Sequence, residues 1–412
     1  MELIYILMVL LVVTRIFGEV AERVGQPAIA GELVAGIILG VTVSLFSDSL
    51  PVLADVHENE VFIGITDLAI FFLMLFAGVE LSPRKLAKSS QGAVLVALGG
   101  FLLPLALGFG LAWIYLPQSD YKMVQSLFVG TAMAITAVPV AVKILMDLGK
   151  LESEPGQMIV SAALFDDILS LVLLAALVAV IQTGTLPGAS DLAILAFKIA
   201  AFFAITGAIG VWIVPRISHL ISKAKAQEFE LSVLLMTGFA YAFLAEELGL
   251  HFILGAFVAG LFFRRSKIEA EVYESVSNQL SGITSGFLAP IFFASIGLNL
   301  DLSALTEIPV FLTLLIIVAF AGKLAGSGLV AYLQGMNGRD ASAVGFAMSG
   351  RGAVELIIAD IALRGGIFQL PDPPPPVVSN LFSAVVIVAV VTTVITPLAL
   401  RRTLGKRGNN AD

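Results

Sequence analysis

Apolar segments of about 20 residues recur along the whole chain, separated by short polar stretches. A helix of that length crosses the ~30 Å hydrocarbon core of a bilayer. The pattern therefore predicts an all-α polytopic membrane protein with about 13 transmembrane helices, each about 20 residues long. We expect them at 2–24, 28–46, 60–80, 91–116, 122–147, 156–182, 192–218, 228–249, 252–264, 280–299, 308–335, 341–364 and 377–400.

One polar segment interrupts this series. Ser266–Gln279 alternates Lys267 with acidic residues and is predicted to form a separate polar helix at the membrane interface, linking two subdomains.

Loop charges predict the orientation. With the N-terminus outside, most loop lysines and arginines fall on the cytoplasmic side, and only Lys122 and Arg364 fall in external loops. Positive residues concentrate on the cytoplasmic side of membrane proteins. We therefore expect a multi-pass protein of the cell (inner) membrane with its N-terminus outside and its C-terminus in the cytoplasm.

Composition narrows the function. The chain is 58% hydrophobic and 13% charged with a mean hydropathy of +1.00, which is typical of a protein that lies in the lipid bilayer. It has no cysteine and 3 histidines, without an HExxH pattern, so thiolate chemistry is excluded and a catalytic zinc is not expected. Phosphate loops and nucleotide fingerprints are absent as well. We expect no enzyme activity, no cofactor and no nucleic-acid partner.

Two adjacent carboxylates, Asp166 and Asp167, lie in the otherwise apolar stretch Ile159–Ile181. Each costs about 2.5–3.5 kcal/mol in mid-membrane unless a cation, water or counter-charge compensates it. Asp167 is the candidate Na⁺-binding carboxylate, and Asp166, about 100° round the helix, faces a different partner. A purely architectural polar cluster is the alternative.

A single connecting span between two six-helix units predicts an inverted repeat. Helix-breaking residues occur in the fifth span at Thr136–Pro139 and in the eleventh at Gly322–Gly326. Paired interruptions are typical of a transporter's midplane site, although proline in a membrane helix also occurs as a simple kink. If the fifth helix unwinds, the Thr136 hydroxyl and freed carbonyl groups supply oxygen ligands for Na⁺.

Further intramembrane charges complete the set of candidates. Lys323 is the predicted base that pairs with one aspartate, with snorkelling to the surface as the alternative. Arg351 and Glu355 are spaced i and i+4, which predicts a structural ion pair on one helix face. No role is assigned to Asp67, Asp360 or Glu32.

Seven stretches in order resemble the second branch of the monovalent cation:proton antiporter superfamily, which includes Kef-type and two-aspartate bacterial Na⁺/H⁺ antiporters. They cover nearly the whole chain: QPAIAGELVAGIILG (26–40), FLMLFAGVELSPRKL (72–86), TAVPVAVKILMDLG (136–149), ALFDDILSLVLL (163–174), LAEELGLHFILGAFVAGLFF (244–263), APIFFASIGLNLDL (289–302) and SGRGAVELIIA (349–359).

The resemblance implies a homodimer whose protomers each have a scaffold and a moving core. It divides the chain into scaffold helices 1–3 (1–80), core helices 4–6 (91–182), a linker helix (192–218), scaffold helices 8–10 (228–299), core helices 11–13 (308–400) and a cytoplasmic tail (401–412). The fifth and eleventh helices are expected to be the crossed, broken pair. With so short a tail, we expect no C-terminal nucleotide-binding regulatory domain.

The resemblance also implies roles for the charged residues. Asp167 binds the ion, and Asp166 pairs with Lys323. The expected function is electrogenic Na⁺/H⁺ antiport by alternating access. K⁺/H⁺ antiport, Li⁺ transport in place of Na⁺, a cation channel and a non-transporting sensor are the alternatives.

Overall fold

All regular structure in the described part of the chain is helical. The computed structural model describes residues 2–46, 51–54, 56, 59–80, 91–136, 141–142, 145–146, 148, 150–183, 189–210, 229–263 and 270–404. Within them, 9 helices are long and apolar enough to cross a membrane, and Ala196–Ala208 and Phe252–Phe262 are shorter apolar helices. The prediction of an all-helical, multi-pass membrane protein is confirmed, whereas the count of thirteen spans stays a prediction.

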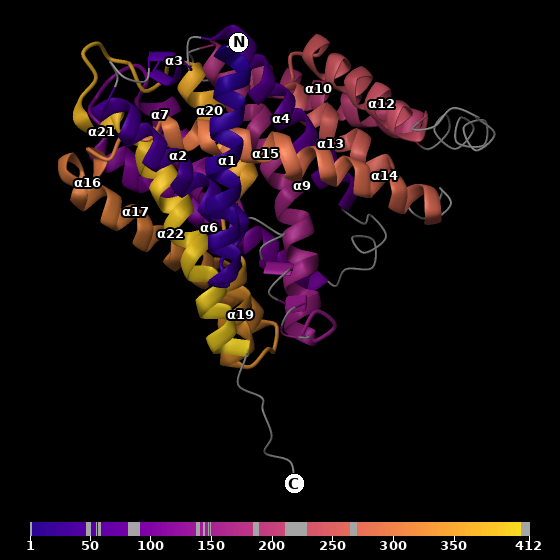
Figure 1. Ribbon diagram of the computed structural model, residues 1–412. Helices are drawn as coiled ribbons and strands as arrows, with labels where there is room; N and C mark the ends of the chain where they lie inside the picture. The colour runs from indigo at the N-terminus through magenta and orange to yellow at the C-terminus, as the bar shows by residue number, and fades with distance from the viewer. Residues whose placement is uncertain are drawn as a thin grey trace. The chain divides into compact units, whose positions relative to one another are not determined.

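The chain divides into two compact units. Figure 1 labels the helices that form them. The first comprises residues 1–16, 35–84 and 187–298, and the second comprises 17–34, 85–186 and 299–412. The long helices α1 (Glu2–Arg23) and α2 (Ala28–Leu45) each contribute to both units.

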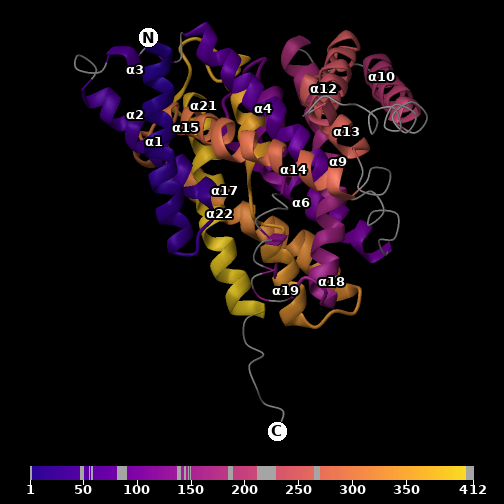
Figure 2. The same ribbon diagram turned by 45° about the vertical axis from the view of Figure 1, so that its right-hand side comes forward.

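In the first unit, α4 (Glu60–Glu80) packs against α13 (Phe252–Phe262). Gly78 lies against the Phe257 carbonyl and Gly260 against that of Leu75, so the two backbones touch. Small residues permit this close approach of membrane helices. The unit also contains α3 (Pro51–Ala54), α10 (Ala189–Ala208) and α12 (Phe229–Glu247), and α12 lies beside α13 (Figure 2).

The predicted polar helix is present from Ala270 onward, but it is not separate from the predicted tenth span, and residues 266–269 lie outside the described residues. The polar residues from Ala270 onward form α14 (Ala270–Ile283), which continues through a π-helical turn, η4 (Thr284–Leu288), into α15 (Ala289–Leu298). The helix widens at Thr284–Leu288, just before Pro290, instead of ending there. The polar segment and the predicted tenth span thus form one continuous helix.

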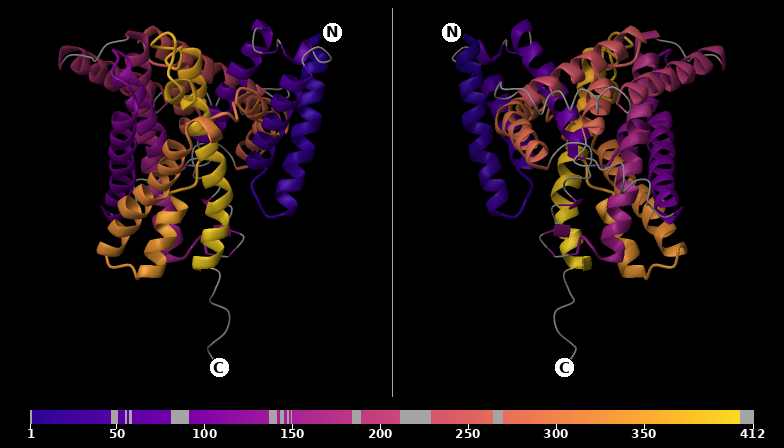
Figure 3. Two further views of the ribbon diagram at one scale, coloured as in Figure 1. Left: turned by 90° about the vertical axis from the view of Figure 1, so that its left-hand side faces the viewer. Right: turned by 90° about the vertical axis from the view of Figure 1, so that its right-hand side faces the viewer.

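The second unit is built around α6 (Gln91–Tyr115), which packs on α7 (Lys122–Ala134), on α9 (Glu154–Thr183) and on α17 (Pro309–Lys323). A π-helical turn, η5 (Leu324–Gly328), joins α17 to α18 (Leu329–Leu333) without a break. The two views in Figure 3 show this composite helix beside the next one, α19. The remaining elements are α16 (Ala304–Glu307), α19 (Gly338–Ala347), α20 (Ala353–Arg364), α21 (Pro376–Ser379) and α22 (Leu381–Leu404).

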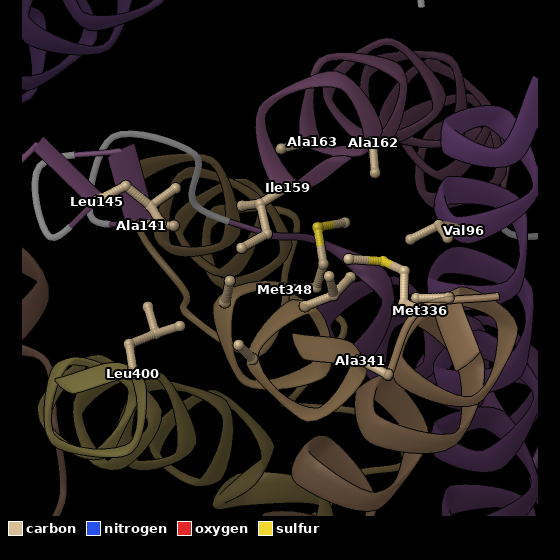
Figure 4. Packing of buried hydrophobic residues seen from close by; sticks show 14 of the residues in the cluster. Val96, Ala141, Leu145, Ile159, Ala162, Ala163, Met336, Ala341, Met348 and Leu400 are labelled. Atoms are coloured by element: carbon tan, nitrogen blue, oxygen red, sulfur yellow. The ribbon is translucent and has the colours of Figure 1, made fainter. Parts of the chain in front are cut away.

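A cluster of buried apolar residues fixes these helices to one another (Figure 4). Met348, which follows α19, lies between Ile159 of α9 and Met336. Leu400 of α22 and Val96 of α6 close the cluster on its two sides. The cluster thus joins α6, α9, α19 and α22 next to the point where α19 ends.

Two interruptions occur in the second unit. The first follows α7, which ends at Ala134; Ile135 is extended with φ −72° and ψ 146°. Residues 137–140, including Pro139, lie outside the described residues. The second interruption separates α19 from α20, with Met348–Gly352 between them.

The predicted interruption of the eleventh span is therefore wrong. Gly322 and Gly326 do not break that helix; they bring it against α6, where Gly322 lies on Pro104 and Gly326 on the Gly99 backbone. The break falls in the twelfth span instead.

Candidate ion-binding site

The C-terminal end of α7 lies inside the second unit with its last carbonyl groups pointing to two buried cations. The final carbonyls of a helix have no partner within that helix, and they form the negative end of its dipole. Arg351 donates from Nη1 to the Ala132 carbonyl and from Nη2 to the Met133 carbonyl at 3.0 Å. Lys323 Nζ donates to the next carbonyl, that of Ala134.

The Lys323 ammonium has two further oxygen neighbours. It donates to Thr136 Oγ1 at 2.6 Å and to Asp166 Oδ1 at 3.5 Å. Lys323 and Asp166 are fully buried, and Thr136 is nearly so. A buried cation is therefore held by a carbonyl, a hydroxyl and a carboxylate oxygen, the three kinds of ligand that bind Na⁺ and other hard cations.

The sequence around Lys323 explains why it reaches this place. Lys323 is the last residue of α17, at the junction with the π-helical turn η5. Single π-helical turns are frequent at functional sites. The close approach of Gly322 and Gly326 to α6 holds this part of the helix deep in the unit.

Hydrogen bonds join the two interruptions. Thr136, after α7, donates from Oγ1 to the carbonyl of Met348, after α19, at 3.1 Å. Thr393 of α22 donates to the Arg351 carbonyl at 2.9 Å. The extended backbone on both sides is thus satisfied by neighbouring helices, which is the condition for irregular backbone at membrane depth.

Arg351 and Glu355 form a buried ion pair with Nη1 and Oε1 3.2 Å apart. They do not share a helix face, because Arg351 precedes Gly352, the N-cap of α20, and lies in the extended segment. Glu355 lies in the first turn of α20, where the helix dipole favours a negative charge. The i and i+4 spacing predicted the ion pair. It did not predict the hydrogen bonds from Arg351 to the carbonyls of α7, because these depend on the tertiary fold.

The aspartate pair lies in the middle of α9. Asp166 faces Lys323 with Oδ1, while its buried Oδ2 has no hydrogen-bond partner among the described residues. The side chain of Asp167 lies outside the described residues. Its predicted role therefore stays a prediction.

Asp360, Glu32 and Asp67 are the remaining intramembrane carboxylates, and no role in this cluster of bonds is assigned to them. Asp360 pairs with Arg364 at 2.8 Å. Glu32 is buried in the second unit against Gly18, and Asp67 belongs to α4 of the first unit. Backbone oxygens of residues 132–134 and 348 take part in the site instead, and a sequence carries no signal for them beyond the helix-breaking Thr136–Pro139.

No group of three or more His, Cys, Asp or Glu side chains suited to a metal ion occurs in the described parts of the chain. The site is built from single oxygens of different chemical kinds around a buried charge. An all-helical membrane protein with interrupted helices that meet at such a site belongs to the class of secondary transporters.

Comparison with known proteins gives the family. Residues 7–406 match the family of transmembrane sodium/hydrogen exchangers, and the chain belongs to that family. It is 30% identical to the Na⁺/H⁺-K⁺ antiporter GerN of Bacillus cereus over 89% of both chains. It is 29% identical to the Na⁺/H⁺ antiporter of Enterococcus hirae, covering 90% of this chain and 92% of that one.

A solved structure shows the same fold. The sodium proton antiporter MjNhaP1 from Methanocaldococcus jannaschii superimposes with a TM-score of 0.71 over 98% of this chain and 99% of that one, at 18% identity.

Proposed function

We propose that the protein exchanges Na⁺ for H⁺ by alternating access, using the oxygens that surround Lys323. Membership of the sodium/hydrogen exchanger family supports the exchange itself. The observation that supports this site is the Lys323 ammonium among Ala134 O, Thr136 Oγ1 and Asp166 Oδ1. The ammonium is a tethered monovalent cation, and it occupies oxygens of the kind that Na⁺ requires.

In this mechanism Na⁺ and protons compete for one set of groups. Na⁺ enters beside Asp167 and Asp166 and takes Thr136 Oγ1 and the Ala134 carbonyl from Lys323. A displaced, buried ammonium without a partner is unstable, so Lys323 releases its proton. On the opposite side Na⁺ leaves, and Lys323 and the aspartate pair take up protons again.

Two protons then move for each Na⁺. One comes from the aspartate pair and one from Lys323, which makes the exchange electrogenic with one net charge per cycle. The Arg351–Glu355 pair serves as a structural pair and carries none of the transported protons.

The proposal also covers the assembly. By resemblance to the second branch of the superfamily, residues 91–182 and 308–400 form the moving core, and residues 1–80 and 228–299 form the scaffold of a homodimer. The protein lies in the inner membrane with its N-terminus outside. Interrupted helices that meet in the core support the division, since transporters bind their ions where such helices meet.

Potassium is a second candidate ion, because the similar protein GerN is described as a Na⁺/H⁺-K⁺ antiporter. Cavity size and ligand number decide between the two ions. Proteoliposomes that contain a pH-sensitive dye test both candidates when Na⁺, Li⁺ or K⁺ is added outside. Dye dequenching with Na⁺ supports Na⁺/H⁺ exchange. Dequenching with K⁺ alone means that K⁺, and not Na⁺, is the transported cation. A cation current without proton movement indicates a channel.

A further inference from the structure

Ser170 lies on the same face of α9 as Asp166, one turn closer to the C-terminal end of the helix. Residues at i and i+4 are neighbours on a helix surface. Ser170 is 1% exposed, and its hydroxyl has no hydrogen-bond partner among the described residues. Asp166 Oδ2, on the same face, is equally buried and also has no partner among them.

Within the described part of the chain, Ser170 shares the lack of a hydrogen-bond partner with the buried hydroxyls of Ser126, Thr284 and Thr396, and of these Ser170 is the one that lies four residues along its helix from a carboxylate oxygen without a partner. Other buried hydroxyls bond to their own backbone. Thr131, Thr206 and Thr392 each donate to the carbonyl four residues earlier in their own helix, at 2.7, 2.7 and 2.9 Å. This internal bond is the usual solution for a buried serine or threonine in a helix. Ser170 is buried to the same extent but does not make it, so its hydroxyl is available to a partner other than its own backbone.

The spacing suits a single bridging water. Four residues at 1.5 Å each separate the two side chains by about 6 Å along the helix axis. A water with two hydrogen bonds of about 2.8 Å each spans a similar distance. Buried waters lie where they satisfy two or more polar groups that have no other partner.

We infer that Ser170 is a positioning residue that holds a water molecule against Asp166 Oδ2, and that protons reach and leave Asp166 by this route. The inference rests on the function proposed above. When the aspartate pair gives up its proton through Asp166, the proton passes from Oδ2 to the water, and the water gives one of its own protons to Ser170 Oγ. Ser170 releases its original proton to water beyond it. One proton moves, and only the aspartate pair changes its charge.

The direction of this route follows from the helix. Ser170 lies toward the C-terminal end of α9, which the predicted topology places outside, so the route serves the outward-facing state of the cycle. Lys323 approaches Asp166 through the other carboxylate oxygen, Oδ1. The proton route and the cation site therefore use different oxygens of Asp166, so a proton can leave while the cation arrives.

Stopped-flow mixing of the purified full-length protein with Na⁺, in weakly buffered detergent solution with a pH dye, tests the inference. We expect Ser170→Ala to slow proton release by at least about 10-fold, with the number of protons released and the Na⁺ concentration for half-maximal release unchanged. Ser170→Thr keeps the hydroxyl and should release protons at nearly the rate of the wild type. Thr206→Ala, which removes an internally bonded hydroxyl from α10, is the matched control and should behave as the wild type.

The possible failures are distinguishable. If the wild type releases no protons on Na⁺ addition, the proposed function fails. If the wild type releases protons and Ser170→Ala releases them equally fast, only the role of Ser170 is overturned. Should the alanine variant not fold, Ser170→Cys has nearly the same volume and a much weaker donor, and release at the wild-type rate in that variant also overturns the inference.

Discussion

Arg351 and Lys323 share the last three carbonyls of α7 between them: Arg351 binds those of Ala132 and Met133, and Lys323 binds that of Ala134. The two cations come from different parts of the chain and are both fully buried. An arginine side chain is not deprotonated in proteins, whereas a lysine can lose its proton when buried. The fixed cation therefore suits the structural end of this row of carbonyls, and the titratable cation suits the end that meets Thr136 and Asp166.

Asp167→Asn is expected to abolish exchange while leaving a folded, extractable protein. An amide cannot alternate between a proton and a cation, so neither half of the cycle can occur. Dye dequenching in proteoliposomes measures the loss. Asp67→Asn, which changes an aspartate of α4 in the first unit, is the control and should retain exchange. Exchange at the wild-type rate in Asp167→Asn removes that residue from the mechanism.

Thr136→Val should weaken apparent Na⁺ affinity by roughly 5- to 100-fold, the equivalent of about 1–3 kcal/mol for a buried oxygen that is lost. The hydroxyl is both a proposed Na⁺ ligand and an acceptor from Lys323, while it donates to Met348. Thr136→Ser keeps the oxygen and should stay within about 3-fold of the wild type. Concentration series of Na⁺ in the proteoliposome assay give both values, and equal affinity in Val and Ser variants contradicts the ligand role.

The sequence predicted the all-helical membrane fold but not the position of the second break. Lys323 and Asp166 were predicted from the cost of a charge in an apolar helix, which acts on each residue alone. Thr136 was predicted from the helix-breaking residues around it, and Arg351 and Glu355 from their i and i+4 spacing. The break at Met348–Gly352 is stabilised by hydrogen bonds to Thr136, to Met133 of α7 and to Thr393 of α22. Because these partners are distant in the sequence, the sequence alone does not predict the break. A glycine in a membrane helix can allow either close helix packing or unwinding. Gly322 and Gly326 allow close packing against α6 and do not unwind their helix.

Arg351→Gln should lower the free energy of unfolding by about 3–5 kcal/mol, because it leaves Glu355 buried and unpaired. It also removes the bonds to Ala132 and Met133. The double variant Arg351→Gln, Glu355→Gln has no buried unpaired charge and should recover part of that loss. Thermal unfolding of the purified proteins in detergent compares the three, and a double variant less stable than Arg351→Gln contradicts the structural pairing.

Apparent Na⁺ affinity should increase with pH over two units around neutrality. Protons and Na⁺ compete for the same carboxylates, so at lower pH the protonated form predominates and more Na⁺ is needed to displace the protons. The Michaelis constant for Na⁺ should therefore fall as pH rises. Initial rates at matched internal and external pH measure it. A Michaelis constant that does not change with pH is incompatible with one shared site.

Transport should respond to membrane potential, and Lys323 should be the reason. Two protons moving against one Na⁺ carry one net charge, for which a potential of 100 mV contributes about 2.3 kcal/mol per cycle. A valinomycin-clamped potential imposed on wild-type proteoliposomes should then shift both the rate and the final Na⁺ gradient.

A variant that removes Lys323 alone is not informative, because it leaves the Asp166 carboxylate buried without its counter-charge, at a cost of about 3–5 kcal/mol in stability. The informative variant is therefore Lys323→Gln combined with Asp166→Asn, which leaves Asp167 as the titrating group and should exchange one proton for one Na⁺ without responding to the potential. If the wild type ignores the potential, Lys323 carries no proton and the two-proton mechanism fails; if the double variant still responds, the second proton is carried by another residue.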